Sequence, residues 1–158
     1  MVKIKKYFKN IILFIFILIL WLISGFIFDI NYDFYNSLNL PIFALNGTII
    51  SIIWFIIYVL ISLSIIIILK KSNIFKNSDY FYILIINYIS NQLFLYFFFN
   101  LMSPFLGLCI TIIIFMSSIF LYIETKKISR RSSYFLVPYL IYNLYALILM
   151  FSVYIMNF

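Results

Sequence analysis

Four polar side chains interrupt a long uncharged segment of the chain, the run from Tyr80 to Phe99. They are Asn87, Ser90, Asn91 and Gln92. Amides in hydrocarbon cost free energy unless they find hydrogen-bond partners. Asn87 and Asn91 lie one helical turn apart and therefore share a helix face. This spacing leaves two alternatives: hydrogen bonds between membrane helices, or the polar groups of a ligand pocket with aromatic walls.

Aromatic residues continue the same pattern. Phe94 and Phe98 follow Asn91 at helical spacing, which extends the polar face into an aromatic one. In another apolar segment, Trp54 and Tyr58 also lie one turn apart. Trp54 falls near the middle of that segment, whereas Trp usually lies at a membrane interface. It is expected either to fill the core of a helix bundle or to form the wall of a pocket.

The composition identifies the medium that must surround these residues. Of 158 residues, 67% are hydrophobic and 9% are charged, so a soluble globular domain would lack polar surface. The net charge is +7, and the basic residues fall in short gaps between apolar runs. This distribution favours a membrane surface as partner and gives no support to nucleic-acid binding.

The apolar runs predict an all-α protein, an integral membrane bundle of five transmembrane helices within a single domain of residues 1–158. Each run has about the 20 residues that a bilayer requires. Ser103 and Pro104 are typical of a helix start, with Ser as N-cap and Pro in the first turn. The first run is too long for a signal peptide and is expected to remain uncleaved. The expected spans are 11–28, 47–69, 80–99, 104–122 and 134–156.

The charge distribution predicts the orientation. With five spans, all 11 Lys and Arg lie on one side of the membrane, including Lys3, Lys5, Lys6 and Lys9. The positive-inside rule then places the N-terminus in the cytoplasm and the C-terminus outside. We expect the bacterial cytoplasmic membrane as the location.

The residue types disfavour several kinds of chemistry. The chain has no His, and no charged residue lies in the middle of a span, so proton coupling and hydrolysis by a buried base are poorly supported. Its one Cys, Cys109, excludes an internal disulfide and argues against a Cys-based metal site. No metal site and no catalytic residue is predicted. An uncharged interior of aromatics and amides suits a flat apolar ligand with a few polar atoms.

The segment from Asp29 to Asn46 is the longest expected stretch without helix. It is rich in Asn and Tyr, and it contains Tyr32 and Phe43. These aromatic residues are typical of a membrane-interface belt, and they could equally form a lid over a pocket.

Three ordered motifs resemble the TspO/translocator-protein family, the tryptophan-rich sensory proteins and peripheral benzodiazepine receptor-like proteins. The resemblance runs from about Tyr35 to the C-terminus. The matching residues are Tyr35, Leu38, Pro41-Ile42-Phe43, Gly47, Trp54 and Tyr58, then Asn91-Gln92-Leu93-Phe94 with Phe98-Phe99, and finally Val137-Pro138-Tyr139-Leu140-Ile141-Tyr142 with Ala146.

This resemblance implies a receptor or sensor that binds porphyrins or other aromatic molecules inside the bundle, beneath the first loop. It implies no cofactor, with protoporphyrin IX or a related tetrapyrrole as the ligand, and it gives the loop residues Tyr32 and Phe43 the role of a lid. The implied ligand-binding residues are Trp54, Tyr58, Asn87, Asn91, Phe94, Tyr142, Tyr145 and Ala146.

Departures from the family pattern keep other functions open. Phe43, Phe94 and Tyr142 stand where the family usually has Trp, and no basic residue follows the fifth span, so sterol binding is not implied. Light-dependent porphyrin breakdown is one alternative, favoured by Trp54 and weakened by Tyr142. Another is a membrane interaction module without a ligand. The expected partners are the lipid bilayer and a flat aromatic small molecule, and a homodimer is left open.

Overall fold

The structure, a computed structural model, describes the backbone of residues 2–158 and the side chains of residues 8–158. The side chains of Lys3, Lys5 and Lys6, which contribute to the predicted orientation, lie outside the described residues.

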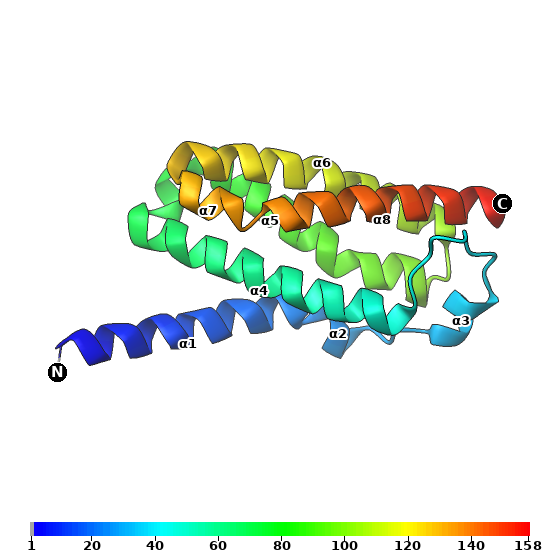
Figure 1. The fold of residues 1–158 in the computed structure, drawn as a ribbon, viewed down its shortest axis with the longest axis horizontal. Coiled ribbons are helices and arrows are strands. Elements are labelled where there is room, and N and C mark those ends of the chain that lie inside the picture. Colours follow the sequence, from blue (N-terminus) through cyan, green and yellow to red (C-terminus); the bar gives the residue numbers. More distant parts are fainter. Residues whose placement is uncertain (1) are drawn as a thin grey trace.

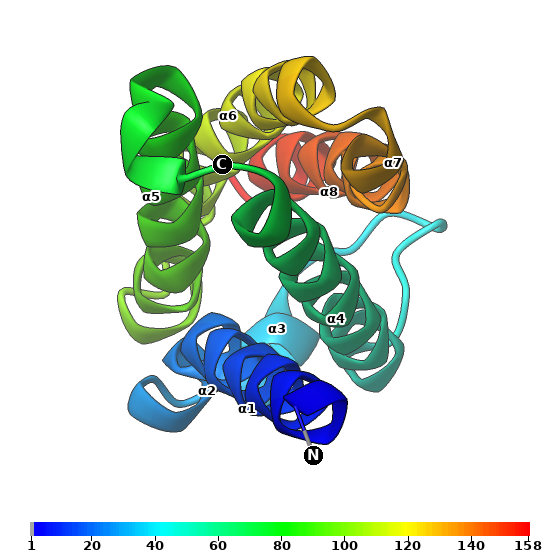
Figure 2. The ribbon, with the colours of Figure 1, turned by 90° about the vertical axis from the view of Figure 1, so that its left-hand side faces the viewer.

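The described chain is all-α and forms a bundle of five long helices, as the apolar runs predict (Figure 1). Around the bundle the order is α1, α4, α8, α6 and α5 (Figure 2). The long helices are α1 (Val2–Leu22), α4 (Gly47–Lys71), α5 (Ser78–Leu95), α6 (Pro104–Ile128) and α8 (Val137–Met156). The short elements are α2 (Ser24–Ile27), α3 (Tyr32–Ser37), η1 (Ile74–Lys76), η2 (Tyr96–Asn100) and α7 (Arg130–Tyr134).

The helices are suited to a bilayer. Four helical segments are long and apolar enough to cross a membrane, and the described apolar part of α1, Phe8–Leu22, adds a shorter one. Large apolar side chains such as Ile141 and Phe151 stand on the outer surface, 66% and 55% exposed. In lipid, this surface lies in a medium as apolar as itself. The protein is an integral membrane protein.

The two ends of the bundle differ in charge. The gaps that contain η1 and α7 lie at the same end as the N-terminus, whereas α3 and the C-terminus lie at the other (Figure 1). Lys70, Lys71 and Lys76 belong to the first of these gaps, and Arg130 and Arg131 to the second. The arrangement that the positive-inside argument requires is therefore present, and which end faces the cytoplasm stays a prediction.

The first span is not the continuous helix expected over residues 11–28, because α1 ends at Leu22 and a separate short helix, α2, follows. Two side chains of α5 form hydrogen bonds with backbone groups at this break. Gln92 Oε1 accepts a hydrogen bond from the Ser24 N–H at 2.9 Å, and Gln92 Nε2 donates to the Trp21 carbonyl at 3.3 Å. Tyr88 Oη donates to the Leu20 carbonyl at 3.1 Å. Irregular backbone at membrane depth requires such partners.

Other boundaries agree with the sequence or differ from it for local reasons. Ser103 caps α6, its Oγ accepting from the Leu106 N–H at 3.3 Å, with Pro104 in the first turn as predicted.

The Asp29–Asn46 segment is not wholly irregular, since it contains α3. Asn31 Oδ1 caps that helix by accepting from the Phe34 N–H at 2.9 Å. The fourth helix extends to Ile128, beyond the predicted end at residue 122, and α7 precedes the last helix.

The third span ends in a π-helical turn, η2, in which the Leu101 N–H donates to the Tyr96 carbonyl at 3.0 Å. A π turn holds one residue more than an α turn. With this wider turn, Phe94, Phe98 and Phe99 all line the same internal cavity.

Candidate functional site

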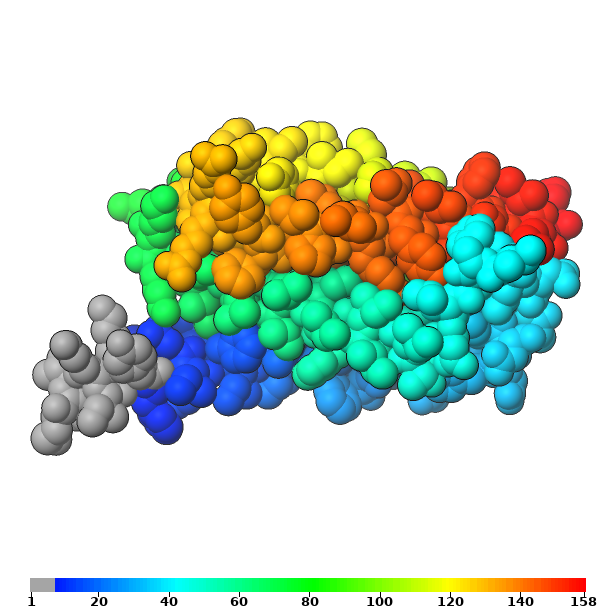
Figure 3. Space-filling model, in the orientation of Figure 1, coloured from blue at the N-terminus to red at the C-terminus, as the bar shows by residue number. Residues whose placement is uncertain are grey.

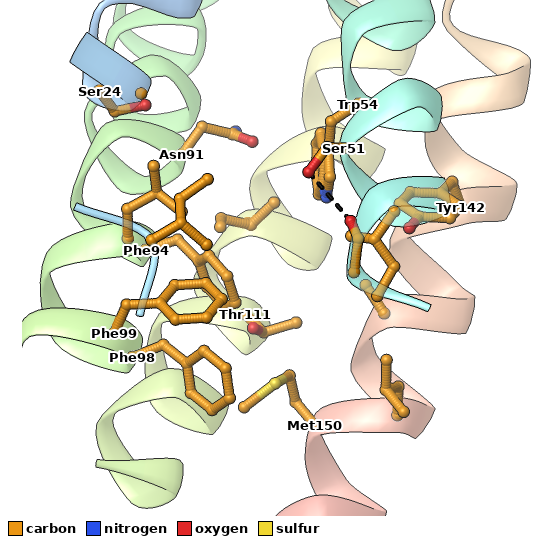
Figure 4. Close-up of a pocket in the computed structure, with 18 of the residues that line it drawn as sticks. Ser24, Ser51, Trp54, Asn91, Phe94, Phe98, Phe99, Thr111, Tyr142 and Met150 are labelled. Atoms are coloured by element: carbon orange, nitrogen blue, oxygen red, sulfur yellow. Dashed lines mark hydrogen bonds between the residues drawn. The ribbon is translucent and has the colours of Figure 1, made fainter. Parts of the chain in front are cut away.

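A cavity of about 210 Å³ lies inside the bundle (Figure 4), and Tyr32 and Tyr35 of α3 are among the residues that line it. Its walls come from α2, α3, α4, α5 with η2, α6 and α8. The exposed members of the lining, Gly25, Tyr32, Ser51 and Phe55, belong to α2, α3 and α4. The cavity therefore reaches the surface where α2, α3 and α4 border it.

Most of the residues predicted to bind a ligand line this cavity. The structure does not place Asn87 or Phe43 in the lining. The predicted residues that do line it are Tyr32, Trp54, Tyr58, Asn91, Phe94, Tyr142, Tyr145 and Ala146.

One wall is built from aromatic residues of α4 and α8 (Figure 4). The rings of Trp54 and Tyr142 meet edge to face, with centroids 5.4 Å apart and planes at 86°. Tyr58 lies one turn from Trp54, at 5.5 Å between centroids, and on its other side it contacts Trp21 at 5.5 Å. Trp21 is 2% exposed and does not line the cavity. The contacts hold the Trp54 ring in one orientation from two sides.

The opposite wall is formed by phenylalanines of α5 and η2 (Figure 4). Phe94 and Phe98 stack with centroids 5.5 Å apart and planes at 22°. Gly107 of α6 permits the close approach of this wall to α8. A Cβ atom at Gly107 would lie 2.7 Å from the Phe98 ring and 2.8 Å from Met150 Cε. The two walls leave between them a space bounded on both sides by ring faces and edges.

The two predicted asparagines of α5 have different roles. Asn87 is fully buried and lies behind the cavity, where its Nδ2 donates to Ser117 Oγ at 2.9 Å and its Oδ1 accepts from Tyr139 Oη at 2.9 Å. Asn91 donates through Nδ2 to the Asn87 carbonyl and to Tyr139 Oη, both at 2.8 Å. Its oxygen points across the cavity in the direction of Trp54 (Figure 4). Both alternatives considered for the amides are therefore represented, helix contact by Asn87 and by the nitrogen of Asn91, and the cavity by the oxygen of Asn91.

The loop that leads from α3 to α4 is tied to α8 by Tyr145. Tyr145 Oη accepts a hydrogen bond from the Leu45 N–H at 3.1 Å and donates one to the Phe43 carbonyl at 3.2 Å. The Phe43 ring lies edge to face with the Tyr145 ring, at 6.4 Å between centroids. Phe43 thus lies against Tyr145 outside the lining, and its role in a lid stays a prediction.

Further contacts hold the same loop. Tyr35 Oη donates to the Leu45 carbonyl at 3.1 Å. Burial raises the pKa of the Tyr35 hydroxyl above its ordinary value, and the neighbouring Tyr145 adds to the shift. Asn39 N–H donates to Asn157 Oδ1 at 2.8 Å, and Asn157 Nδ2 donates to the Asn39 carbonyl at 3.0 Å. Figure 3 shows the loop, in cyan, against the end of α8, in red.

Several lining residues were not predicted from the sequence. They include Ser24, Ser51, Thr111, Asn143 and Met150. The hydroxyls of Ser51 and Thr111 donate to carbonyls of their own helices, at 3.0 Å and 2.7 Å, so their protons are already used in hydrogen bonds. Asn143 had a detectable signal, since it is an amide in the middle of the apolar run 134–156. The polar groups of the lining are amides and hydroxyls, which can orient a neutral ligand through hydrogen bonds.

Comparison with known proteins gives consistent results. A protein of Bacillus subtilis (strain 168) described as an uncharacterized membrane protein, YtaB, is 36% identical over 156 residues, covering 97% of this chain and 99% of that protein. The tryptophan-rich protein TspO of Bacillus cereus is 29% identical over 149 residues, covering 94% of this chain and 97% of that protein. The model of the TspO/MBR family matches residues 11–156, which extends the predicted resemblance to the first helix. The chain belongs to the TspO/MBR family.

Proposed function

We propose that this protein is a membrane sensor or receptor that binds a tetrapyrrole or a similar flat aromatic molecule in the cavity between α4, α5 and α8. The observation that supports the proposal most is the pair of aromatic walls, Trp54 with Tyr142 and Phe94 with Phe98, on either side of the cavity. Ring faces and edges bind flat aromatic ligands through stacking and edge-to-face contacts. A related protein carries the name tryptophan-rich protein TspO.

The size of the cavity sets a condition on the ligand. Its volume of about 210 Å³ is below the roughly 300–1,000 Å³ of pockets that enclose drug-sized ligands. A small aromatic molecule fits the cavity as it stands, whereas a tetrapyrrole requires the walls to separate. The loop with α3 is tied to α8 by hydrogen bonds of Tyr145 and Asn157, and Phe34 of α3 packs edge to face against Phe98 of η2. We therefore propose that this loop moves outward when a tetrapyrrole binds.

Equilibrium titration with protoporphyrin IX tests the proposal. The protein is held in lipid nanodiscs, and empty nanodiscs measure partition of the pigment into lipid. We expect saturable binding to the protein, weakened in Trp54→Ala by about 1–3 kcal/mol through loss of the aromatic wall. Binding no stronger than to empty nanodiscs would contradict the proposal.

A second candidate function is light-dependent breakdown of a bound tetrapyrrole. It is favoured by the series of oxidisable rings that leads away from the cavity, Trp54 to Tyr58 to Trp21, each centroid 5.5 Å from the next. Loss of pigment absorbance in light but not in the dark, dependent on Trp54, would support this function. Stable pigment under both conditions would restrict the protein to binding.

A further inference from the structure

A second cavity, the basic-end cavity, lies at the end of the bundle opposite α3 (Figure 1) and measures about 510 Å³. Its walls come from the end of α4, from η1, from the start of α5 and from the end of α6. It shares no residue with the lining of the aromatic cavity. Its volume lies within the roughly 300–1,000 Å³ of pockets that bind small molecules.

The charged residues of the basic-end cavity leave one positive charge in excess. Three lysines and two carboxylates line it. Lys127 Nζ donates to Glu124 Oε1 at 2.6 Å, so these two charges offset each other. The remaining three are Lys71, Lys76 and Asp79, and among the described residues neither lysine forms a salt bridge. Electrostatic complementarity therefore favours a ligand that carries one negative charge.

The Tyr80 hydroxyl is a free donor in the same cavity. Tyr80 lines the basic-end cavity and is 2% exposed. Its hydroxyl forms no hydrogen bond within the described part of the chain, and it is not one of the unpaired atoms there that are sealed from solvent. A buried hydroxyl without a partner is unfavourable, because it has lost its hydrogen bonds to water. An acceptor oxygen of a ligand in this cavity would supply the missing partner.

The start of α5 adds further donors. Asn77 precedes this helix and directs its Nδ2 away from it, to Ser72 Oγ at 2.7 Å and to the Asn73 carbonyl at 3.0 Å. Its side chain makes no cap hydrogen bond to the first turn. The first turn of a helix has N–H groups without intrahelical partners and a partial positive charge, and both favour anionic oxygens. Lysine, tyrosine and backbone donors together suit the oxygens of a phosphate group.

The level of the basic-end cavity in the membrane indicates the source of that phosphate. Helices α4 and α6 have 25 residues each. At 1.5 Å per residue they measure about 37 Å, more than the roughly 30 Å of the hydrocarbon core. Their last turns, with Lys71 and Lys127, therefore lie among the lipid headgroups. Farther along the bundle, Ile86 of α5 and Phe120 and Ile123 of α6 are exposed to the hydrocarbon.

We propose that the basic-end cavity binds the phosphodiester of a membrane phospholipid. Lys71 and Lys76 pair with the phosphate oxygens, and Tyr80 Oη donates to one of them. The acyl chains of the same lipid lie along the apolar outer surface of α5 and α6. This site is separate from the aromatic cavity and does not depend on its function. A lipid bound there contacts the ends of α4, α5 and α6 at once and so stabilises the folded bundle.

Three probes separate the phosphate from the rest of the lipid. They are dioctanoyl phosphatidylglycerol, dioctanoylglycerol, which has the same chains without phosphate, and inorganic phosphate. Each is titrated into the full chain, freed of native lipid in a non-ionic detergent, and the Tm is followed. We expect phosphatidylglycerol to raise the Tm to a plateau, and the other two to change it little at the same concentration. An equal effect of dioctanoylglycerol would assign binding to the chains, and an equal effect of inorganic phosphate would show a site that needs no lipid. Either result contradicts the proposal.

Paired lysine variants test whether the cavity itself holds the lipid. Lys71→Gln with Lys76→Gln removes two charges from its lining. Lys70→Gln with Lys126→Gln is the matched control, because it removes two exposed charges from the same end that do not line the cavity. We expect the first pair to weaken phosphatidylglycerol binding at least about tenfold, as loss of charge-assisted hydrogen bonds does, and the control pair less than about threefold. Equal weakening by both pairs would mean that the lipid responds only to the overall charge of this end, which would overturn the site.

Tyr80→Phe tests the free hydroxyl, since it keeps the ring in place. We expect phosphatidylglycerol to bind several-fold more weakly to this variant, while the Tm of the lipid-free protein stays unchanged because the hydroxyl has no partner to lose. Unchanged lipid binding, or a lower Tm without lipid, would contradict the role given to Tyr80 in the site.

Discussion

Asn91 on α5 donates a hydrogen bond to Tyr139 Oη on α8 at 2.8 Å, and Tyr139 Oη in turn donates to Asn87 Oδ1 at 2.9 Å. Tyr139 is fully buried. The same Asn91 side chain turns its oxygen into the cavity (Figure 4). A residue of the candidate site is therefore also a contact between two helices, so a change at Asn91 affects both stability and binding.

A double-mutant cycle measures the helix contact. Asn91→Leu and Tyr139→Phe should each destabilise the bundle, and the two together should cost less than the sum of the single changes by about 1 kcal/mol, because they remove the same hydrogen bond. Reversible unfolding in mixed micelles gives the free energies. Strict additivity of the two changes would show that the contact contributes nothing to stability.

The break after α1 provides a second test of polar contacts. Gln92→Leu removes the acceptor of the Ser24 N–H and the donor to the Trp21 carbonyl. We expect a loss of about 1–3 kcal/mol in unfolding free energy and faster amide hydrogen exchange at Ser24. Unchanged exchange at Ser24 would mean that Gln92 does not hold the break.

Tyr145 should control access to the cavity. Tyr145→Phe keeps the ring in the lining and removes both hydrogen bonds to the loop, from the Leu45 N–H and to the Phe43 carbonyl. We expect faster hydrogen exchange in residues 38–46 and faster association of protoporphyrin. Tyr154→Phe is the control, since no hydrogen bond of the Tyr154 hydroxyl occurs among the described residues and its ring contacts Phe105 and Phe158. Equal association rates in both variants would exclude the loop as a barrier to entry.

The orientation in the membrane can be tested by labelling. In a Cys109→Ser background, Asn36→Cys in α3 should react with an impermeant thiol reagent added outside intact cells. Phe75→Cys in η1, which is 79% exposed and lies between Lys71 and Lys76, should react only after the membrane is opened. The opposite pattern would reverse the orientation that the basic residues predict.

The affinity for protoporphyrin should depend little on salt. The described Lys and Arg side chains from Lys70 to Lys76 and from Lys126 to Arg131 belong to the end of the bundle opposite α3. Screening by salt weakens attraction between exposed opposite charges, and at the cavity end the loop supplies Asp29 and Asp33 instead. A steep loss of affinity at high ionic strength would place the porphyrin carboxylates at the basic end.

Local patterns predicted the helices and many of the residues that line the cavity. The long apolar runs, the Ser103–Pro104 start and the one-turn spacings of Trp54 with Tyr58 depend on neighbouring residues, and the structure contains them. The break before α2 could not be predicted in this way, because the side chain that supports it, Gln92, is 68 positions from Ser24 along the chain.

The roles of the individual amides also could not be predicted from the sequence. Asn87 and Asn91 share one helix face, yet the partners that separate their roles, Ser117 and Tyr139, belong to α6 and α8. Asn143 is an amide in an apolar run, and its place in the lining of the cavity became visible only in the structure. Spacing along one helix identifies a face, and only the packing of the other helices shows which polar groups remain for a ligand.

The most direct test uses Trp54 as a probe of its own cavity. Trp21→Phe leaves Trp54 as the one Trp of the chain, since the sequence contains 2. Ala146→Phe, added to that variant, fills the cavity from α8 and serves as the control. Titration with protoporphyrin IX in lipid nanodiscs should quench Trp54 to saturation at one ligand per protein, and Ala146→Phe should abolish the saturable part. Quenching that never saturates, or that is unchanged by Ala146→Phe, would contradict binding inside the bundle.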